Sequence, residues 1–467
     1  MRQFIRGNVR FIIAFIAMAV ALRLLFIRFF PAVVADSFVY GDIAKNWLQH
    51  GIFGLSGPEE ISPTYIRLPG YPAFLAFIFS IFGMEHYRAV LVTQMLIDIG
   101  TCFIGADIAL LAFGRRAAKI SFVLATVCPF LANYAGAALT ETLEVFFTAL
   151  AFDFALRALQ SDSMRVWAGC GVACGAAILL RPDGILLAFA FVLYLVWKIA
   201  RPKPFEKSKR NIFARAAVIV ALASLAPLVP WTWRNWHVFH AFQPLAPRYA
   251  NEQGESVPMG FNRWVKTWIA DYTSVEEIYW NVPGAEMDAS KLPSRAFDTP
   301  QQRAQTEDLL RDYNTLLQVS PVLDQRFDAI ASERIRAHPI RYYIGLPLLR
   351  IMDMWLRPRT EMMPSDSRWW EFNDEPKWSA LAITLGVINL LYILCACAGG
   401  LRNRLASALG LMLLFIAMRT LFLGSLENPE PRYTLEMYPL VIVLTAAGMK
   451  KTKEVSPKGN QSCESGS

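Results

Sequence analysis

The sequence predicts an all-α membrane protein that crosses the bilayer about ten times. Of its 467 residues, 55% are hydrophobic and only 18% are charged. The apolar residues come in blocks of about 20, the length that a helix needs to span lipid. Lysine and arginine cluster in short segments beside these blocks, as they do in polytopic membrane proteins. The net charge of +8 therefore reflects topology, and a nucleic-acid-binding face is excluded.

The first crossing is predicted at residues 11–30, behind the arginines of a cytoplasmic N-terminus. Val33 and Ala35 satisfy the small-residue rule of a signal-peptide cleavage site. An apolar stretch of about 20 residues is longer than a usual signal core, so we predict an uncleaved helix. This helix delivers Asp36 to the outer face.

The first outer loop is predicted to be residues 32–85. In its opening stretch, "AVVADSFVYGDIAKNWLQHG", apolar residues recur at helical spacing and Gly51 marks the end of a helix. Asp36 or Ser37 could simply cap that helix, or Asp36 could be a catalytic acid. Residues 68–83 are proline-rich at their start and number about 16, which suits a re-entrant or interfacial helix.

The remaining crossings follow from apolar length and from the positive-inside bias. They are predicted near residues 86–113, 117–132, 138–159, 164–181, 183–199, 213–231, 377–398, 404–424 and 431–449. This threading places "GRRAAK", "KIARPKPFEKSKRNIFAR" and "LRNR" in the cytoplasm, and "RPDG" and "ENPEPRY" outside. Both termini are then cytoplasmic.

The predicted organisation is an N-terminal transmembrane module (1–231), an outer-face segment (232–376), C-terminal spans (377–449) and a disordered cytoplasmic tail (450–467). Within the outer segment, residues 338–357 are apolar but carry charged side chains. A crossing there would turn "LRNR" outward, so we predict a juxtamembrane helix on the outer face.

Polar residues of mixed sign gather at the outer ends of the predicted spans. They are Asp36, Arg67, Glu141, Arg181, Asp183, Arg234, Glu430, Arg432 and Tyr433. Charges near lipid are costly, so several at one level predict a shared polar cavity. Any one of them could also be charged only because water begins there. Other acids inside spans, such as Asp98, Asp107 and Asp153, are interpreted as helix–helix hydrogen-bond partners.

Several enzyme classes are excluded by missing motifs. No "GxxxxGK", "HExxH" or "GxSxG" sequence occurs, which argues against an ATP-driven pump, a zincin and a nucleophile-elbow hydrolase. Six of the seven cysteines lie in apolar runs and predict neither disulfides nor a zinc site. His237 and His240 have helical spacing but lack an obvious third ligand.

An ordered set of motifs resembles a known family. The set is the acid after the first span, "RLPGYPAFLAF", "GRRAAKISFVLATVCPFLANYAGAALTETLEVFFTALAF", "LLRPDGILLAF", "PWTWRNW" and "PEPRYTLEMYPLVIVL". It resembles glycosyltransferase family 39 in the GT-C superfamily, whose relatives include protein O-mannosyltransferases and aminoarabinose transferases of lipid A. The resemblance covers most of residues 1–235 and 377–449, and it implies a GT-C-type helical bundle with outer-face juxtamembrane helices.

The resemblance also implies roles for single residues. Asp36 maps onto the catalytic base, and Glu141 onto the second-loop acid. Arg67 maps onto a residue lining the site, and Arg432-Tyr433 onto a late "RY" pair. The family often has an acidic pair where this chain has Asp36-Ser37, which leaves open whether a divalent metal is used. No other cofactor is implied.

The implied activity is the transfer of a monosaccharide, with inversion, from a polyprenyl-phosphate carrier to an acceptor hydroxyl. Arg432 and Tyr433, with Arg67 or Arg234, would bind the donor phosphate. Tyr40, Tyr71 and Arg181 would line the substrate site. The expected partners are the lipid-linked donor, membrane lipid and a glycan, lipid or protein acceptor, with the site on the outer (periplasmic) face of a bacterial inner membrane.

A polytopic secondary transporter or a lipid-linked sugar flippase is the alternative, since it also needs charges within about ten spans. Against it, no inverted repeat is visible, and the charges lie at the outer face and not at the midplane where transporters bind. An inactive membrane scaffold with the same fold is a third interpretation.

Overall fold

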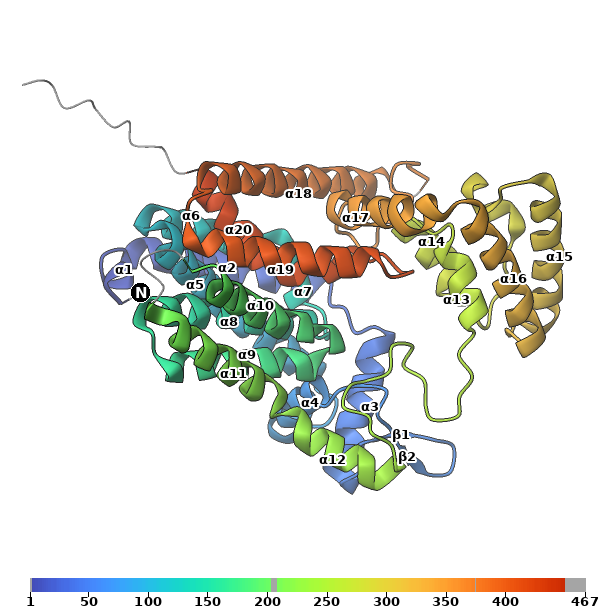
Figure 1. Cartoon of the computed structure of the whole chain (residues 1–467), viewed down its shortest axis with the longest axis horizontal. Coiled ribbons are helices and arrows are strands. Elements are labelled where there is room, and N and C mark those ends of the chain that lie inside the picture. Colours follow the sequence, from blue (N-terminus) through green and yellow to red (C-terminus); the bar gives the residue numbers. More distant parts are fainter. Residues whose placement is uncertain (1, 203–207, 374, 450–467) are drawn as a thin grey trace, which may run out of the picture.

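The computed structural model describes residues 2–202, 208–373 and 375–449. The described chain is almost entirely helical, and its only sheet is one antiparallel hairpin, β1 (Gly54–Ser56) and β2 (Ile61–Pro63), within those ranges. A long bundle of helices carries a smaller group of helices beyond one end (Figure 1). The all-α fold class is confirmed, whereas the predicted tail lies outside the described residues.

The helices of the first half of the chain are mostly apolar. They are α1 (Arg2–Arg6), α2 (Val9–Phe29), α3 (Ala35–His50), α4 (Gly70–Phe82), α5 (Tyr87–Phe113), α6 (Arg115–Thr126), α7 (Pro129–Ala135), α8 (Glu141–Ser161), α9 (Met164–Leu180), α10 (Ile185–Ala200), α11 (Arg210–Leu225) and α12 (Leu228–Phe239).

The second half contains short outer helices followed by long apolar ones. They are α13 (Met259–Lys266), α14 (Tyr272–Ser274), α15 (Pro300–Leu316), α16 (Pro321–Ala337), α17 (Leu346–Leu356), α18 (Pro376–Arg402), α19 (Ser407–Gly424) and α20 (Tyr438–Gly448). Short segments of 3₁₀ helix also occur, among them Pro182–Gly184 and Pro431–Met437, and Arg341–Gly345 is a π-helical segment that leads into α17.

Six of the described helical segments are long and apolar enough to cross a membrane. They are Val9–Phe29, Tyr87–Phe113, Pro182–Ala200, Arg210–Phe239, Pro376–Arg402 and Ser407–Gly424, with the bent pair α6–α7 as a seventh. The prediction of a multi-pass membrane protein is therefore confirmed. The count of about ten stays a prediction, because α8 carries several acids and α9 and α20 are short.

The two apolar segments that were predicted not to cross the membrane, 68–83 and 338–357, are helical. α4 has 13 residues, and about 20 are needed to span the hydrocarbon. Residues 339–356 form a continuous helix that is not among the six candidate spans. Their placement at the interface stays a prediction.

The centre of the bundle is α20, the last described helix. All eleven of its residues are buried, and it lies between α18, α5 and α6. A Cβ atom on Gly399 of α18 would lie 1.9 Å from the carbonyl oxygen of Leu444 in α20. Backbone-to-backbone packing of this kind is typical of membrane helices and leaves little room for movement. It fixes Pro431–Met437, the turn that enters α20.

Ion pairs cross-link the membrane helices. Arg23 of α2 binds Asp98 of α5 at 2.7 Å, with both side chains almost fully buried. Arg157 of α8 pairs with Asp107 of α5 and, within its own helix, with Asp153. The interpretation of Asp98 and Asp107 as helix–helix partners is confirmed, while Asp153 has its pair inside one helix.

A second hydrophobic core lies in the outer segment. It is built from aromatic and aliphatic side chains of α13, α15, α16 and the residues after α13, including Trp264, Trp268, Leu309 and Phe327. These helices lie beyond the end of the bundle (Figure 1). Packing against one another, they bury their apolar faces without needing the membrane helices.

Candidate functional site

Asp36 lies in the first turn of α3 but does not cap it. The hydroxyl of Ser37 accepts a hydrogen bond from the backbone N–H of Val34 at 3.1 Å. The Asp36 carboxylate faces two guanidinium groups instead, with Oδ1 3.0 Å from Arg67 Nη2 and Oδ2 3.9 Å from Arg432 Nη2. Its side chain is 39% exposed. The carboxylate is therefore accessible and free of a helix-capping role.

Arg432 joins three acidic residues that come from distant parts of the chain. It lies in the turn Pro431–Met437 and is mostly buried. Its Nη2 approaches Asp36, its Nη1 lies 3.8 Å from Glu141 Oε1, and its Nε lies 2.5 Å from Glu430 Oε2. Two of these contacts are longer than a hydrogen bond, so Arg432 keeps donors that a further anion can use.

Glu141 begins α8 and lies between two arginines. One of its oxygens is 3.8 Å from Arg432 and 3.8 Å from Arg181 Nη1. Arg181 also approaches Glu144 and Asp183, and its guanidinium lies 4.6 Å above the ring of Tyr433. Two arginines and several carboxylates thus form one buried network at the ends of α8, α9 and α3.

The two tyrosines predicted to line the site form a wall beside Asp36. Arg67 lies 5.6 Å from the ring centre of Tyr40, and Tyr40 meets Tyr71 edge to face at 5.1 Å. Tyr71 is fully buried and donates to Gln94 Oε1 at 2.8 Å. Tyr40 therefore borders the arginine–carboxylate network, and Tyr71 supports it from behind.

Arg234 is the one predicted site residue that the structure places apart from this network. Its guanidinium donates to the backbone carbonyls of Thr64 and Phe53, both at 2.7 Å. It also lies over the rings of Phe53, Trp231 and Phe239. These contacts fasten α12 to the first outer loop.

Arg419 and Glu436 belong to the network but were not predicted. Arg419 lies in the apolar helix α19, is fully buried, and contacts Asp183 at 2.9 Å and Glu436 at 2.5 Å. It ties the turn after α9 to the turn that carries Arg432. The available signal was a lone arginine within the apolar run "LMLLFIAMRTLFLG".

The residues of the network do not fit a metal centre. Among the residues that the structure describes, no three His, Cys, Asp or Glu side chains are placed to hold a metal ion together. Arginines separate the carboxylates, and their positive charge opposes a cation. The chemistry derived below therefore uses only the side chains of the network.

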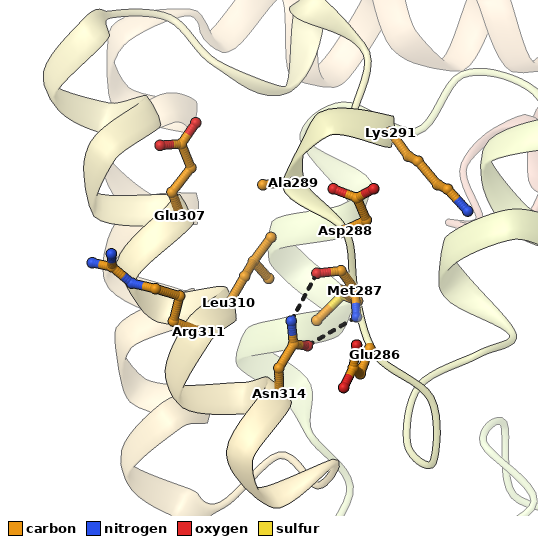
Figure 2. A pocket seen from close by; sticks show the side chains of 9 residues that line it. All are labelled: Glu286, Met287, Asp288, Ala289, Lys291, Glu307, Leu310, Arg311 and Asn314. Carbon is orange, nitrogen blue, oxygen red and sulfur yellow. Dashed lines mark hydrogen bonds between the residues drawn. The ribbon is translucent and has the colours of Figure 1, made fainter.

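A separate cavity of about 580 Å³ lies in the outer segment. Figure 2 shows its lining side chains on α15 and the facing loop, where Asn314 exchanges two hydrogen bonds with the backbone of Met287. Exposed charges of both signs surround it, and none of the predicted site residues lies there. The network around Arg432 is therefore the candidate active site.

Residues 63–231 match a family model described as dolichyl-phosphate-mannose-protein mannosyltransferase. The predicted resemblance is confirmed. The matched range contains Arg67, Tyr71, Glu141 and Arg181, and it leaves out Asp36 and Arg432. No curated protein matches the chain in sequence.

Solved structures share a similar course of the chain at low sequence identity. The archaeal oligosaccharyltransferase AglB of Archaeoglobus fulgidus, in complex with an inhibitory peptide and a dolichol-phosphate, has a TM-score of 0.49 at 11% identity, over 93% of this chain and 50% of that one. ArnT of Cupriavidus metallidurans, bound to undecaprenyl phosphate, has a TM-score of 0.41 at 14% identity, over 93% and 78%. The chain spans about half the length of the oligosaccharyltransferase.

Proposed function

We propose that the protein is an inverting membrane glycosyltransferase that moves a monosaccharide from a polyprenyl-phosphate carrier to an acceptor hydroxyl. The observation that carries the proposal is an accessible carboxylate, Asp36, held beside two arginines at the mouth of a buried polar network. An acyl-transfer enzyme of the nucleophile-elbow type or an ATP-driven enzyme would need the "GxSxG" or "GxxxxGK" motif, and the sequence contains neither. A lipid-linked donor brings its own activated sugar and needs only a base and an anion site.

Asp36 is the proposed general base. As the acceptor oxygen forms its bond to the anomeric carbon, its proton passes to the Asp36 carboxylate. The bond from the anomeric carbon to the phosphate oxygen breaks, and its electron pair leaves with the phosphate. One displacement of this kind inverts the anomeric centre and needs no covalent enzyme intermediate. A positioned base contributes typically about 10²–10⁴ in rate.

Arg432 and Arg67 are the proposed phosphate ligands. Negative charge grows on the leaving phosphate, and preorganised guanidinium donors stabilise such charge where water is largely excluded. Arg432 is mostly buried and Arg67 partly so, and both already face the base. Arg234 is not included because two backbone carbonyls accept from it. Tyr433 supports the site, since its ring lies beneath the guanidiniums of Arg181 and Arg432.

Glu141 is the proposed orienting residue for the sugar or the acceptor. One of its oxygens faces the two arginines, and the other, Oε2, is buried without a hydrogen-bond partner among the described residues. An acceptor in that state suits a substrate hydroxyl. Arg181 and Tyr40 complete the lining.

The proposed location of this site is the outer face of an inner membrane, with both termini in the cytoplasm. The helix of residues 339–356 agrees with that placement. Its exposed apolar residues recur every four positions, at Ile340, Ile344, Leu348, Met352 and Leu356. Such a row suits a helix that lies on lipid, where a carrier tail could reach the site.

The test is sugar transfer by the purified full-length chain in detergent micelles. The donors are polyprenyl-phosphate-linked neutral hexoses, neutral pentoses and amino sugars, and crude cell envelope is the acceptor. We expect release of lipid phosphate and labelled product from one donor, with a loss of about 10²–10⁴ in Asp36→Asn. Glu59→Gln, which changes an exposed acid of the same loop, is the control and should keep full activity.

Two outcomes would count against the proposal. If no donor turns over, the transferase assignment fails, and carrier binding without release of phosphate would favour the flippase or transporter. If Asp36→Asn keeps normal turnover, Asp36 is not the base even though the enzyme class stands.

A further inference from the structure

The segment that follows α17 contacts the turn that carries Arg432. Arg359 in this segment is buried, donates to the carbonyl of Pro431 at 2.7 Å and also donates to Thr434. Its guanidinium lies 5.7 Å from the ring centre of Phe130 on α7. The segment is therefore fastened both to the turn that carries Arg432 and to the helix that precedes Glu141.

Glu361, two residues further along this segment, is partly buried, and its carboxylate is in an unusual state. Both of its carboxylate oxygens are shielded from solvent, and neither has a hydrogen-bond partner among the described residues. The hydroxyl of Tyr134 on α7 is in the same state. Folded proteins rarely leave buried polar atoms unpaired, and a missing ligand or water is a usual reason.

These unpaired groups lie around Arg432. The Tyr134 hydroxyl interacts electrostatically with Glu361, with the site acid Glu141 and with Arg432. Glu361 in turn interacts with Glu430, the direct partner of Arg432. Unpaired oxygens from α7, α8 and the segment after α17 thus lie within electrostatic range of the candidate active site.

The arginines near Glu361 balance its charge without bonding to its oxygens. Arg359 donates to Pro431, Thr434 and the hydroxyl of Tyr438. Arg357 donates to Thr273 and to the carbonyl of Ser367. A carboxylate whose charge is compensated but whose lone pairs are free suits neutral donors. Sugar hydroxyls are such donors.

We propose that Glu361 and Tyr134 form a sugar-recognition subsite that hydrogen-bonds hydroxyls of the monosaccharide on the lipid-linked donor. The proposal rests on the function proposed above. Glu361 accepts hydrogen bonds from two ring hydroxyls, and the Tyr134 hydroxyl exchanges one more. Asp36, Arg67 and Arg432 are left to the phosphate and the incoming acceptor, so sugar identity and leaving-group chemistry are recognised by different residues.

The experiment compares binding of two ligands to the full-length chain in detergent. One ligand is bare polyprenyl phosphate, and the other is the same lipid carrying the monosaccharide that the donor panel identifies. We expect Glu361→Gln and Tyr134→Phe each to weaken binding of the sugar-loaded carrier about tenfold or more. Affinity for the bare carrier should not change. Glu286→Gln, which alters an acid lining the cavity of Figure 2, is the control.

The outcomes separate this subsite from its alternatives. An equal loss of affinity for both ligands would assign Glu361 a structural role, and unchanged affinity for both would mean that water alone fills the space; either result overturns the proposal. A wild-type chain that binds neither ligand overturns the proposed function itself. If Glu361→Gln does not fold, Tyr134→Phe, which keeps the ring and removes one oxygen, decides the matter.

Discussion

Two buried arginines, one in each core of the molecule, show opposite degrees of hydrogen bonding. Arg334 in the outer segment donates to Thr267 at 2.9 Å, to Ala296 at 2.6 Å, to Gln302 at 2.8 Å and to Arg295 at 2.8 Å. Arg432 in the bundle meets two of its three carboxylates at 3.8 and 3.9 Å. Both side chains are mostly or fully removed from water.

The difference distinguishes a structural charge from a functional one. A buried guanidinium with complete hydrogen bonding stabilises one arrangement of the chain, and removing it leaves its partners unpaired. A guanidinium with loose contacts and unpaired neighbours gains its full hydrogen bonding when a ligand arrives. The outer core therefore has the hydrogen bonding of a support, and the network around Arg432 has the loose contacts that we expect of the proposed binding site.

The largest expected effect is on the stability of the outer segment. Arg334→Leu removes all the hydrogen bonds that this guanidinium donates and leaves Asp298, 3.4 Å away, without one of its charge partners. We expect a loss of about 3–5 kcal/mol in the free energy of unfolding. Chemical denaturation followed by the fluorescence of Trp264 and Trp268 would measure it. A variant as stable as wild type would show that complete hydrogen bonding is no sign of a structural role.

The converse change should affect activity more than stability. Arg432→Gln removes the donor that we assign to the leaving phosphate, so we expect turnover to fall about 10²–10³-fold. The unfolding midpoint should fall less than that of Arg334→Leu, because only Glu430, at 2.5 Å, is in close contact with the Arg432 guanidinium, and Asp36 and Glu141 lie beyond hydrogen-bond distance. If the variant unfolds readily and the folded fraction retains normal turnover, Arg432 is a structural charge like Arg334. The contrast between the two arginines would then be wrong.

The sequence was sufficient to predict the helical multi-pass fold and the meeting of Asp36, Arg67, Glu141 and Arg432. Threading by apolar length and positive charge predicts that all four lie at the same membrane face. A shared face and the cost of isolated charges near lipid together predict that they share one polar site. Their pairing within the network followed from no local pattern, since α3, α8 and the turn before α20 are far apart in sequence.

The sequence could not reveal the direction of a side chain or the packing of the outer segment. Arg234 is predicted at the same membrane face, but its guanidinium turns to the backbone of the first outer loop. Glu361 lies in a stretch without any motif, and its place beside Tyr134 arises only from the anchoring of Arg359. Arg419 was visible as a charge in an apolar helix, but its partners Asp183 and Glu436 depended on tertiary contacts.

A third prediction concerns Asp353, a buried acid of α17 at the junction of the two regions. Burial raises its pKa to about 6, although Arg357 lies near and the backbone N–H of Tyr272 donates to it at 2.8 Å. An acid with a raised folded-state pKa contributes stability that is fully present below its unfolded pKa and lost as pH rises through its folded pKa. We expect stability to fall by about 2–3 kcal/mol between about pH 4 and pH 6.

Asp353→Asn keeps an acceptor for Tyr272 and cannot ionise, so it is the matched control for this pH dependence. Denaturation midpoints of both proteins from pH 4 to pH 7 provide the measurement. Parallel pH profiles for the two proteins would contradict the prediction, because another group would then be responsible for the change.

The smallest expected effect belongs to the exposed ion pairs of the outer helices. Arg303 and Glu307 are 2.8 Å apart on one face of α15, and both side chains are about half exposed. Pairs of this spacing contribute about 0.3–0.5 kcal/mol to helix stability and are screened by salt. We expect Glu307→Gln to lower the unfolding free energy by no more than this amount, and the difference to vanish in about 1 M salt. A short ion-pair distance in water then contributes far less stability than the buried hydrogen bonds of Arg334. Hydrogen bonding and burial together, and not distance alone, distinguish structural charges in this protein.

A loss as large as that of Arg334→Leu would contradict this conclusion. It would mean that α15 depends on its surface charges, and that burial does not explain the contrast between Arg334 and Arg432.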